Sequence, residues 1–229
     1  MIVKVCGMRE ADNIRAVSEL GVDMLGFDFR PESQRFVAMV TSRAGIIPDY
    51  SEEQMGRYKV GGNALAGAAQ SAQPLRVGVF SDDMPQNIVT RVYNYQLDYV
   101  QLNGSESRVM IENLKRTLEP DIRRGVRVIK TLLVITPDDI LKYKEYEGVA
   151  DMYLFVVKSL EEQADWNILN DYDGQTPFLL GGCIGLDDAE RIAAFRHPRF
   201  AGVSVSSQFE TEPGVKDVEK LRRFMTKIS

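Results

Sequence analysis

Residues able to do chemistry lie at the ends of apolar, strand-like runs of this sequence. Cys6 ends the run IVKVC and is followed by Gly7, which leaves backbone room beside the thiol. A thiol can act as a general base where its surroundings favour the thiolate. A cysteine at a strand end can equally be a small buried apolar group, so position alone leaves both interpretations open.

A second candidate is Arg35, in the segment FDFRPESQRF that follows the second apolar run. Pro31 stiffens this segment, and a guanidinium fork held at its end could bind a carboxylate through two hydrogen bonds. The alternative is a solvated loop arginine. In the same segment Arg30 and Glu32 could simply pair with one another.

Two segments rich in hydrogen-bond donors follow the last two apolar runs. One is Gly181–Gly185 (GGCIG) and the other is Ser204–Ser207 (SVSS). Glycine lets backbone N–H groups approach phosphate oxygens, although a glycine pair is ordinarily just a turn. The residues expected to bind a phosphate are Gly181, Gly182, Ser204, Ser206 and Ser207.

Eight short β-rich runs alternate with longer stretches whose apolar residues recur at helical spacing, such as Glu10–Leu20 and Asp187–Phe195. The other helical candidates are Pro85–Tyr95, Glu106–Leu118, Pro137–Tyr146, Asp165–Tyr172 and Val218–Ile228. Strands separated by helices pair in parallel through right-handed crossovers, and this pattern predicts an α/β protein with a single (β/α)₈ barrel. Loops after strands seven and eight of such barrels commonly hold phosphate. The predicted strands are Ile2–Cys6, Asp23–Phe27, Leu75–Phe80, Asp98–Leu102, Val126–Leu132, Met152–Val157, Thr176–Leu180 and Ala201–Val205.

The length suits one barrel domain spanning residues 1–229, since such barrels take about 250 residues. Eight strands leave no residues for a second domain. The segment 45–73 contains Pro48 and the pair Gly61–Gly62, and it is expected to be an enlarged, irregular loop.

Composition excludes several classes of function. The formal net charge is −5, which gives no overall positive field for nucleic acid or anionic lipid. Two cysteines make a disulfide framework implausible, and no apolar stretch reaches the 18 or more residues of a membrane span. His197, expected to be structural, and the two cysteines lack zinc-site spacing. We expect a soluble cytoplasmic monomer or homodimer that takes a small phosphorylated metabolite and needs no metal or other cofactor.

The segment Lys4–Val37 resembles the N-terminal signature of the phosphoribosylanthranilate isomerase family, Amadori-type aldose–ketose isomerases of tryptophan biosynthesis. The resemblance implies a phosphorylated sugar attached to anthranilate as substrate and acid–base chemistry without a cofactor. It continues through Arg76–Asp83, Asp98–Ser107, Val128–Leu132, Ala164–Trp166, Pro177–Ala189 and Phe209–Asp217.

Some residues of this chain match the family's functional residues, and others differ from them. Cys6 matches the family's general base, and Arg35 matches the arginine associated with the anthranilate carboxylate. The family's general acid is an aspartate at the end of strand six, where this chain has Val156, and valine cannot transfer a proton. Asp28 stands where an apolar residue is usual, and it is the candidate substitute acid.

Further departures surround the mouth of the predicted barrel. Cys183 stands where a glycine is expected, Ser204 where an aspartate is, and Asn103 where a histidine is common. The glycine-rich run that follows the acid in the family is replaced by Ser159–Gln163. Two hypotheses remain. One is an authentic isomerase of this family, and the other is a diverged paralogue, with the general acid lost, that binds a phosphorylated or carboxylated metabolite without efficient isomerase activity.

Overall fold

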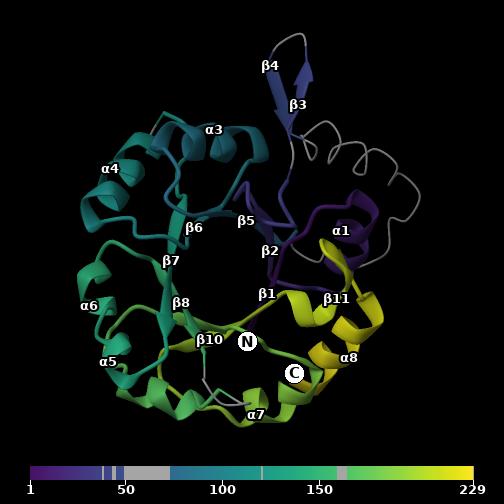
Figure 1. Cartoon of the computed structure of the whole chain (residues 1–229), viewed down its shortest axis with the longest axis vertical. Coiled ribbons are helices and arrows are strands. Elements are labelled where there is room, and N and C mark those ends of the chain that lie inside the picture. The colour runs from purple at the N-terminus through teal and green to yellow at the C-terminus, as the bar shows by residue number, and fades with distance from the viewer. Residues whose placement is uncertain (38, 43–44, 49–72, 120, 159–163, 229) are drawn as a thin grey trace.

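The computed structural model describes residues 1–37, 39–42, 45–48, 73–119, 121–158 and 164–228, and it contains one closed barrel of eight parallel strands (Figure 1). The order around the barrel is β1-β10-β9-β8-β7-β6-β5-β2, and β1 closes it by pairing with both β10 and β2. The predicted (β/α)₈ fold is therefore confirmed. The strands are β1 (Ile2–Cys6), β2 (Met24–Asp28), β5 (Leu75–Phe80), β6 (Tyr99–Leu102), β7 (Arg127–Val134), β8 (Met152–Val157), β9 (Phe178–Gly181) and β10 (Phe200–Val205).

Helices form a ring around the barrel and cover its outer face (Figure 1). In α8 the buried residues Leu221, Phe224 and Ile228 are three and four positions apart, so they share the face turned to the barrel. The helices are α1 (Ala11–Ser18), α3 (Pro85–Tyr95), α4 (Arg108–Leu118), α5 (Pro137–Ile140), α6 (Tyr143–Tyr146), α7 (Ala189–Ala194) and α8 (Val218–Ile228), with 3₁₀ turns at Trp166–Asp171, Leu186–Asp188 and Ser207–Phe209.

A small hairpin extends from the barrel after β2. It consists of β3 (Met39–Ser42) and β4 (Gly45–Pro48), which pair antiparallel. Of the segment 45–73, expected to be irregular, residues 45–48 form β4, and residues 49–72 lie outside the described part of the chain. A second two-stranded pair, β11 (Glu210–Glu212) and β12 (Val215–Lys216), lies between β10 and α8.

The apolar core has two parts, and their separation shows which side chains point into the barrel. In β8, Met152 and Leu154 belong to the smaller part, whereas Tyr153 and Phe155 pack with helix residues in the larger part. Because side chains alternate along a strand, Val156 continues the inward series toward the mouth. The buried members of the inner part are Met24, Val77, Tyr99, Ile129, Met152, Leu154 and Leu179.

His197 precedes β10 at the opposite end of the barrel from the mouth. Its Nδ1 accepts a hydrogen bond from the backbone N–H of Arg199 at 3.0 Å, and its Nε2 lies 3.0 Å from the carbonyl oxygen of Tyr172. Both ring nitrogens therefore serve to fix the chain entering β10. Within the described ranges, no helix combines the length and apolar character needed to cross a membrane.

Candidate active site

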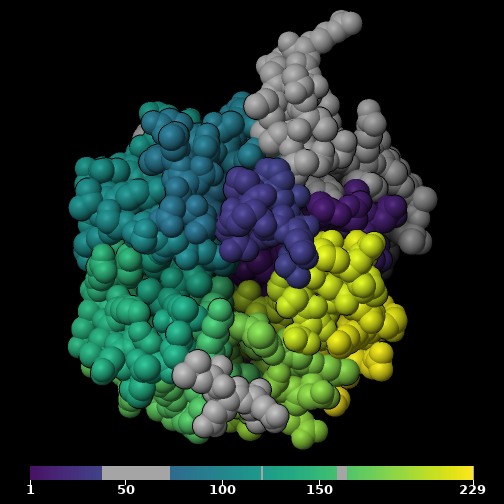
Figure 2. Space-filling view, viewed as in Figure 1, coloured from purple at the N-terminus to yellow at the C-terminus, as the bar shows by residue number. Residues whose placement is uncertain are grey.

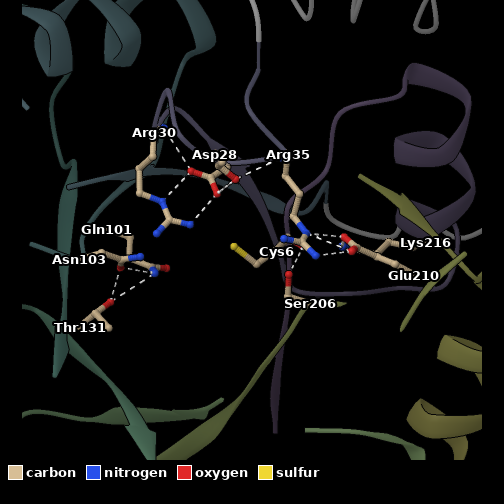
Figure 3. Close-up of polar contacts among 11 residues, drawn as sticks. Cys6, Asp28, Arg30, Arg35, Gln101, Asn103, Thr131, Ser206, Glu210 and Lys216 are labelled. Carbon is tan, nitrogen blue, oxygen red and sulfur yellow. Dashed lines mark hydrogen bonds and ion pairs between the residues drawn. The ribbon is translucent and has the colours of Figure 1, made fainter. Parts of the chain in front are cut away.

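Cys6 is the last residue of β1 and lies half-buried at the mouth of the barrel. Its register partner on β2 is Gly26, where an added Cβ would come within 2.8 Å of Cys6 Sγ. Gly26 therefore provides the room that the thiol occupies. Figure 3 shows the sulfur pointing toward the open centre of the mouth, while the Ser206 hydroxyl donates to the Cys6 carbonyl oxygen at 3.1 Å.

Arg35 lies beside Cys6 and is held by Glu210. Arg35 Nε lies 2.8 Å from Glu210 Oε1, and Arg35 Nη2 lies 2.5 Å from Glu210 Oε2. Lys216, fully buried, also pairs with Glu210. The arginine side chain passes directly over Gly7, whose φ of +78° suits glycine and where a Cβ would overlap the Arg35 side chain. Position Gly7 thus serves both the turn after β1 and the placement of Arg35.

The roles of Glu210 and Lys216 were missed by the sequence reasoning. Both belong to Phe209–Asp217, one of the segments that carry the family resemblance, so the signal was present without an assigned role. Burial by itself raises the pKa of Glu210, but hydrogen bonds from Arg35 and Lys216 outweigh it and lower the pKa. Glu210 is therefore ionised at neutral pH and holds two cations near the thiol.

Asp28 ends β2 and is engaged by Arg30 through a bidentate contact. Arg30 Nε lies 2.8 Å from Asp28 Oδ1 and Arg30 Nη2 lies 2.7 Å from Oδ2. The Ser33 hydroxyl donates to Asp28 Oδ2 at 2.7 Å and accepts from the backbone N–H of Arg35 at 3.1 Å. Arg30 therefore pairs with Asp28 and not with Glu32, which corrects the expectation from the sequence.

These contacts make Asp28 unsuitable as the substitute acid. Burial raises the pKa of Asp28, but the hydrogen bonds from Arg30 and Ser33 reverse the effect, and the net shift is downward from 3.8. Asp28 is ionised at neutral pH and has no proton to donate. It also lies on β2, four strands around the eight-stranded barrel from Val156 on β8.

The Val156 side chain faces the same mouth of the barrel as Cys6, from β8, which is three strands away from β1. It is half-buried, and its register partners are Leu133 on β7 and Gly181 on β9. Leu133 is exposed at this rim. At the position where the resemblance led us to expect an acid, the rim therefore carries the apolar side chains of Leu133 and Val156. The segment Ser159–Gln163, which differs from the glycine-rich run expected after the acid, lies outside the described residues.

The predicted phosphate residues separate into two groups. Gly181 ends β9, and Gly182 has a φ of +119°, with the Val157 carbonyl oxygen 3.0 Å from where a Cβ would stand. Glycine is thus required at this turn. Ser206 and Ser207 follow β10 at the mouth, and Cys183 is exposed.

Ser204 does not belong with them. It is buried inside the barrel, where its hydroxyl accepts a hydrogen bond from Lys4 Nζ at 3.2 Å. Lys4 and Ser204 are register partners on β1 and β10, one inward position below Cys6. We therefore remove Ser204 from the predicted phosphate site.

A third polar group stands across the mouth from Cys6, as Figure 3 shows. Gln101 Nε2 donates to Asn103 Oδ1 at 2.8 Å, and the Thr131 hydroxyl donates to the same oxygen at 2.6 Å. Gln101 is buried, and within the described chain its Oε1 has no hydrogen-bond partner. Buried acceptors are nearly always satisfied, so this oxygen is available to an N–H or O–H group of a ligand.

Comparison of the whole chain with known proteins points to one family. The model of the N-(5'-phosphoribosyl)anthranilate (PRA) isomerase family matches residues 57–227. A relative from Parabacteroides distasonis, named N-(5'-phosphoribosyl)anthranilate isomerase, is 38% identical over 100% of this chain and 93% of its own. One of the same name from Phocaeicola vulgatus is 32% identical over 100% of this chain and 98% of its own.

Solved structures show the same fold. A phosphoribosyl anthranilate isomerase in complex with reduced 1-(O-carboxyphenylamino)-1-deoxyribulose 5-phosphate superposes with a TM-score of 0.74 at 24% identity, covering 100% of this chain and 98% of the other. Monomers generated from the dimeric Thermotoga maritima enzyme superpose with a TM-score of 0.73 at 24% identity, with the same coverage.

Proposed function

The chain belongs to the N-(5'-phosphoribosyl)anthranilate isomerase family, and from this premise we propose that it converts N-(5'-phosphoribosyl)anthranilate into 1-(o-carboxyphenylamino)-1-deoxyribulose 5-phosphate in tryptophan biosynthesis. One observation carries the proposal. The Cys6 thiol faces the centre of the mouth, with arginines on the side of β2 and, on the side of β9 and β10, the glycine and serine turns at which we expect the phosphate to bind.

The order of strands gives the substrate a direction. Around the rim, β9 and β10 precede β1, and β2 follows it. A phosphate held at Gly181, Gly182, Ser206 and Ser207 places the ribose over Cys6 and the arylamine over β2. The carboxylate then meets Arg35, whose guanidinium is already fixed by Glu210.

The reaction moves protons and needs no change of oxidation state in the protein. Proton transfer to the ring oxygen opens the furanose to a protonated Schiff base. Cys6 then removes the C2′ proton, which gives an enolamine. The enolamine becomes the ketone when C1′ gains a proton and the hydroxyl on C2′ loses one. The cations Arg30, Arg35 and Lys216 all interact electrostatically with Cys6.

Val156 sets the rate in this proposal. A positioned general acid contributes about 10²–10⁴ in rate, so turnover is reduced by that factor relative to the same site with an aspartate at position 156. Binding is unaffected by the loss, because the phosphate and carboxylate sites lie on other strands.

The remaining assignments concern partners and compartment. We propose that a small phosphorylated metabolite is the ligand, with no nucleic acid partner, and that the protein acts in the cytoplasm as a monomer or homodimer. The net charge of −5 supports the first two. The Thermotoga maritima comparison includes monomers made from a dimer.

A direct assay tests the function. Purified protein is mixed with freshly made N-(5'-phosphoribosyl)anthranilate, and loss of substrate fluorescence is followed over a wide range of enzyme concentration. We expect turnover proportional to enzyme and growth rescue of a tryptophan auxotroph that lacks the isomerase. Binding of the reduced product analogue with no detectable turnover and no rescue would favour the binding paralogue, for which the comparisons give no support.

A further inference from the structure

Arg30 and Asp28 form a pair that the proposed proton transfers do not use. Asp28 is buried, whereas the Arg30 side chain is 31% exposed and reaches the mouth. A backbone contact reinforces the pair, since the Arg30 N–H donates to Asp28 Oδ1 at 3.1 Å. In the space-filling view the segment after β2 lies near the centre of the open face (Figure 2). A buried carboxylate thus fixes an arginine at the entrance.

The two arginines of the mouth are held in the same manner. Each uses Nε and Nη2 on one carboxylate, Asp28 for Arg30 and Glu210 for Arg35. Within the described residues, Nη1 of Arg30 makes no hydrogen bond, so its donors are free for a ligand. Ser33 joins the two systems by donating to Asp28 and accepting from the Arg35 backbone.

Fixing a long cation in advance reduces the entropy lost when it binds an anion. An arginine that is merely solvated needs no buried carboxylate to hold it. Burying the Asp28 carboxylate costs free energy, and the ion pair with Arg30 offsets that cost. The geometry in Figure 3 directs the Arg30 guanidinium toward the space between Cys6 and Gln101. This is the side of the mouth where the arylamine end of the substrate lies.

We propose that Arg30, positioned by Asp28, is a second carboxylate-binding residue, which with Arg35 holds the anthranilate carboxyl group of the substrate. This assignment rests on the proposed function and adds a specificity-determining residue to it. Arg30 contacts the carboxylate through Nη1, and Asp28 is a positioning residue. The pair then discriminates substrates with an ortho-carboxylate from the corresponding phenylamines.

The test compares two ligands on each variant of the full-length protein by calorimetry. One is reduced 1-(o-carboxyphenylamino)-1-deoxyribulose 5-phosphate, and the other is its counterpart without the carboxyl group. Arg30→Met should weaken the carboxylated ligand about 10- to 100-fold and leave the other within about twofold, because a hydrogen bond to a charged group is lost in only one complex. Arg116→Met, which removes an exposed arginine from α4, is the matched control and should change neither.

Two further variants guard against a folding effect. Arg30→Lys keeps the charge but not the fork, and Asp28→Asn keeps the shape of the carboxyl side chain but not its charge. Both should weaken the carboxylated ligand selectively, by less than Arg30→Met.

Equal weakening of both ligands by Arg30→Met, or no weakening at all, would overturn the role of Arg30. If the wild-type protein binds neither ligand and has no isomerase activity, the proposed function fails, and the assignment of Arg30 fails with it.

Discussion

The two halves of the barrel mouth differ in kind. The half formed by β1 and β2 carries Cys6 together with two arginines that are each held by a carboxylate. The half formed by β7 and β8 carries Leu133 and Val156, side by side and without an ionisable group at either position. One half thus carries the groups that we propose bind anions and accept a proton, while the other carries only apolar side chains at Leu133 and Val156.

This contrast shows that binding and proton donation are separable in the fold. Each strand end contributes its own side chains to the mouth, so a change on β8 leaves the residues on β1 and β2 in place. Replacing a carboxylate by valine also removes a desolvation cost and lets the inner core extend to the rim. If the two halves are independent, a substitution in one should leave the contribution of the other unchanged.

Replacing the thiol should have the largest effect. Cys6→Ser removes the base, and we expect kcat to fall by about 10²–10⁴, with near-native affinity for the reduced product analogue. Cys183→Ser, which removes the other thiol, should lower kcat far less because it takes no proton. Steady-state kinetics on both variants measures the difference, and comparable losses would show that the thiol of Cys6 has no special role.

The buried ion pair of Lys130, on β7, with Glu106 should affect the stability of the fold and not the rate of the reaction. Lys130 Nζ on β7 lies 2.8 Å from Glu106 Oε2, with both side chains 2% exposed. Lys130→Met leaves Glu106 buried without its cation and should lower the free energy of unfolding by about 3–5 kcal/mol. Urea titrations measure this. At a temperature where the variant is folded, kcat should be unchanged, and a large fall in kcat would mean that the pair reaches the site.

Removing an anion-binding arginine should affect substrate binding more than turnover. Arg35→Met should raise KM about 10- to 100-fold with a smaller change in kcat, since the carboxylate contact is made in both ground and transition states. Leu133→Ala, at the apolar side of the same mouth, should alter KM by a few-fold at most. Similar KM increases in both variants would erase the distinction between the halves.

The Asp28 carboxylate should make a small, pH-dependent contribution to the free energy of unfolding. Its folded-state pKa is lowered from 3.8, so the carboxylate stabilises the folded protein fully above 3.8 and loses this contribution as the pH falls through the lower folded value. The stability difference between the wild type and Asp28→Asn should therefore be constant from pH 7 to about 5 and shrink in more acidic solution. A difference that grows below pH 4 would contradict the assigned ion pair.

The sequence predicted the barrel because hydrophobic periodicity and β-branched runs repeat eight times. The bounds of β1, β5 and β8 match the predicted strands, and those of α3 and α8 match the predicted helices. Two helical stretches were less regular: 137–146 divides into α5 and α6, and 166–171 is a 3₁₀ turn. The hairpin of β3 and β4 was missed because its strands are short and Pro48 argues against a strand.

The side chains of the mouth could be predicted in part. Strand ends fix where Cys6 and Val156 emerge, because parallel strands bring their carboxyl ends to one rim. The partners of Arg30 and Arg35 depend on loop conformation and on contacts 175 residues apart in the case of Glu210, which no local pattern encodes. Ser204 points into the barrel two residues before Ser206, and this difference in depth places its hydroxyl against Lys4 and below the mouth.

We infer that the β8 side of the mouth lacks only a proton donor, and single-turnover kinetics of Val156→Asp measure the consequence. If the base and anion sites are intact, the variant should isomerise N-(5'-phosphoribosyl)anthranilate about 10²–10⁴ times faster than the wild type, and adding Cys6→Ser should abolish the gain. An unchanged rate in Val156→Asp, or a wild-type rate already as high as that of the variant, would contradict the account.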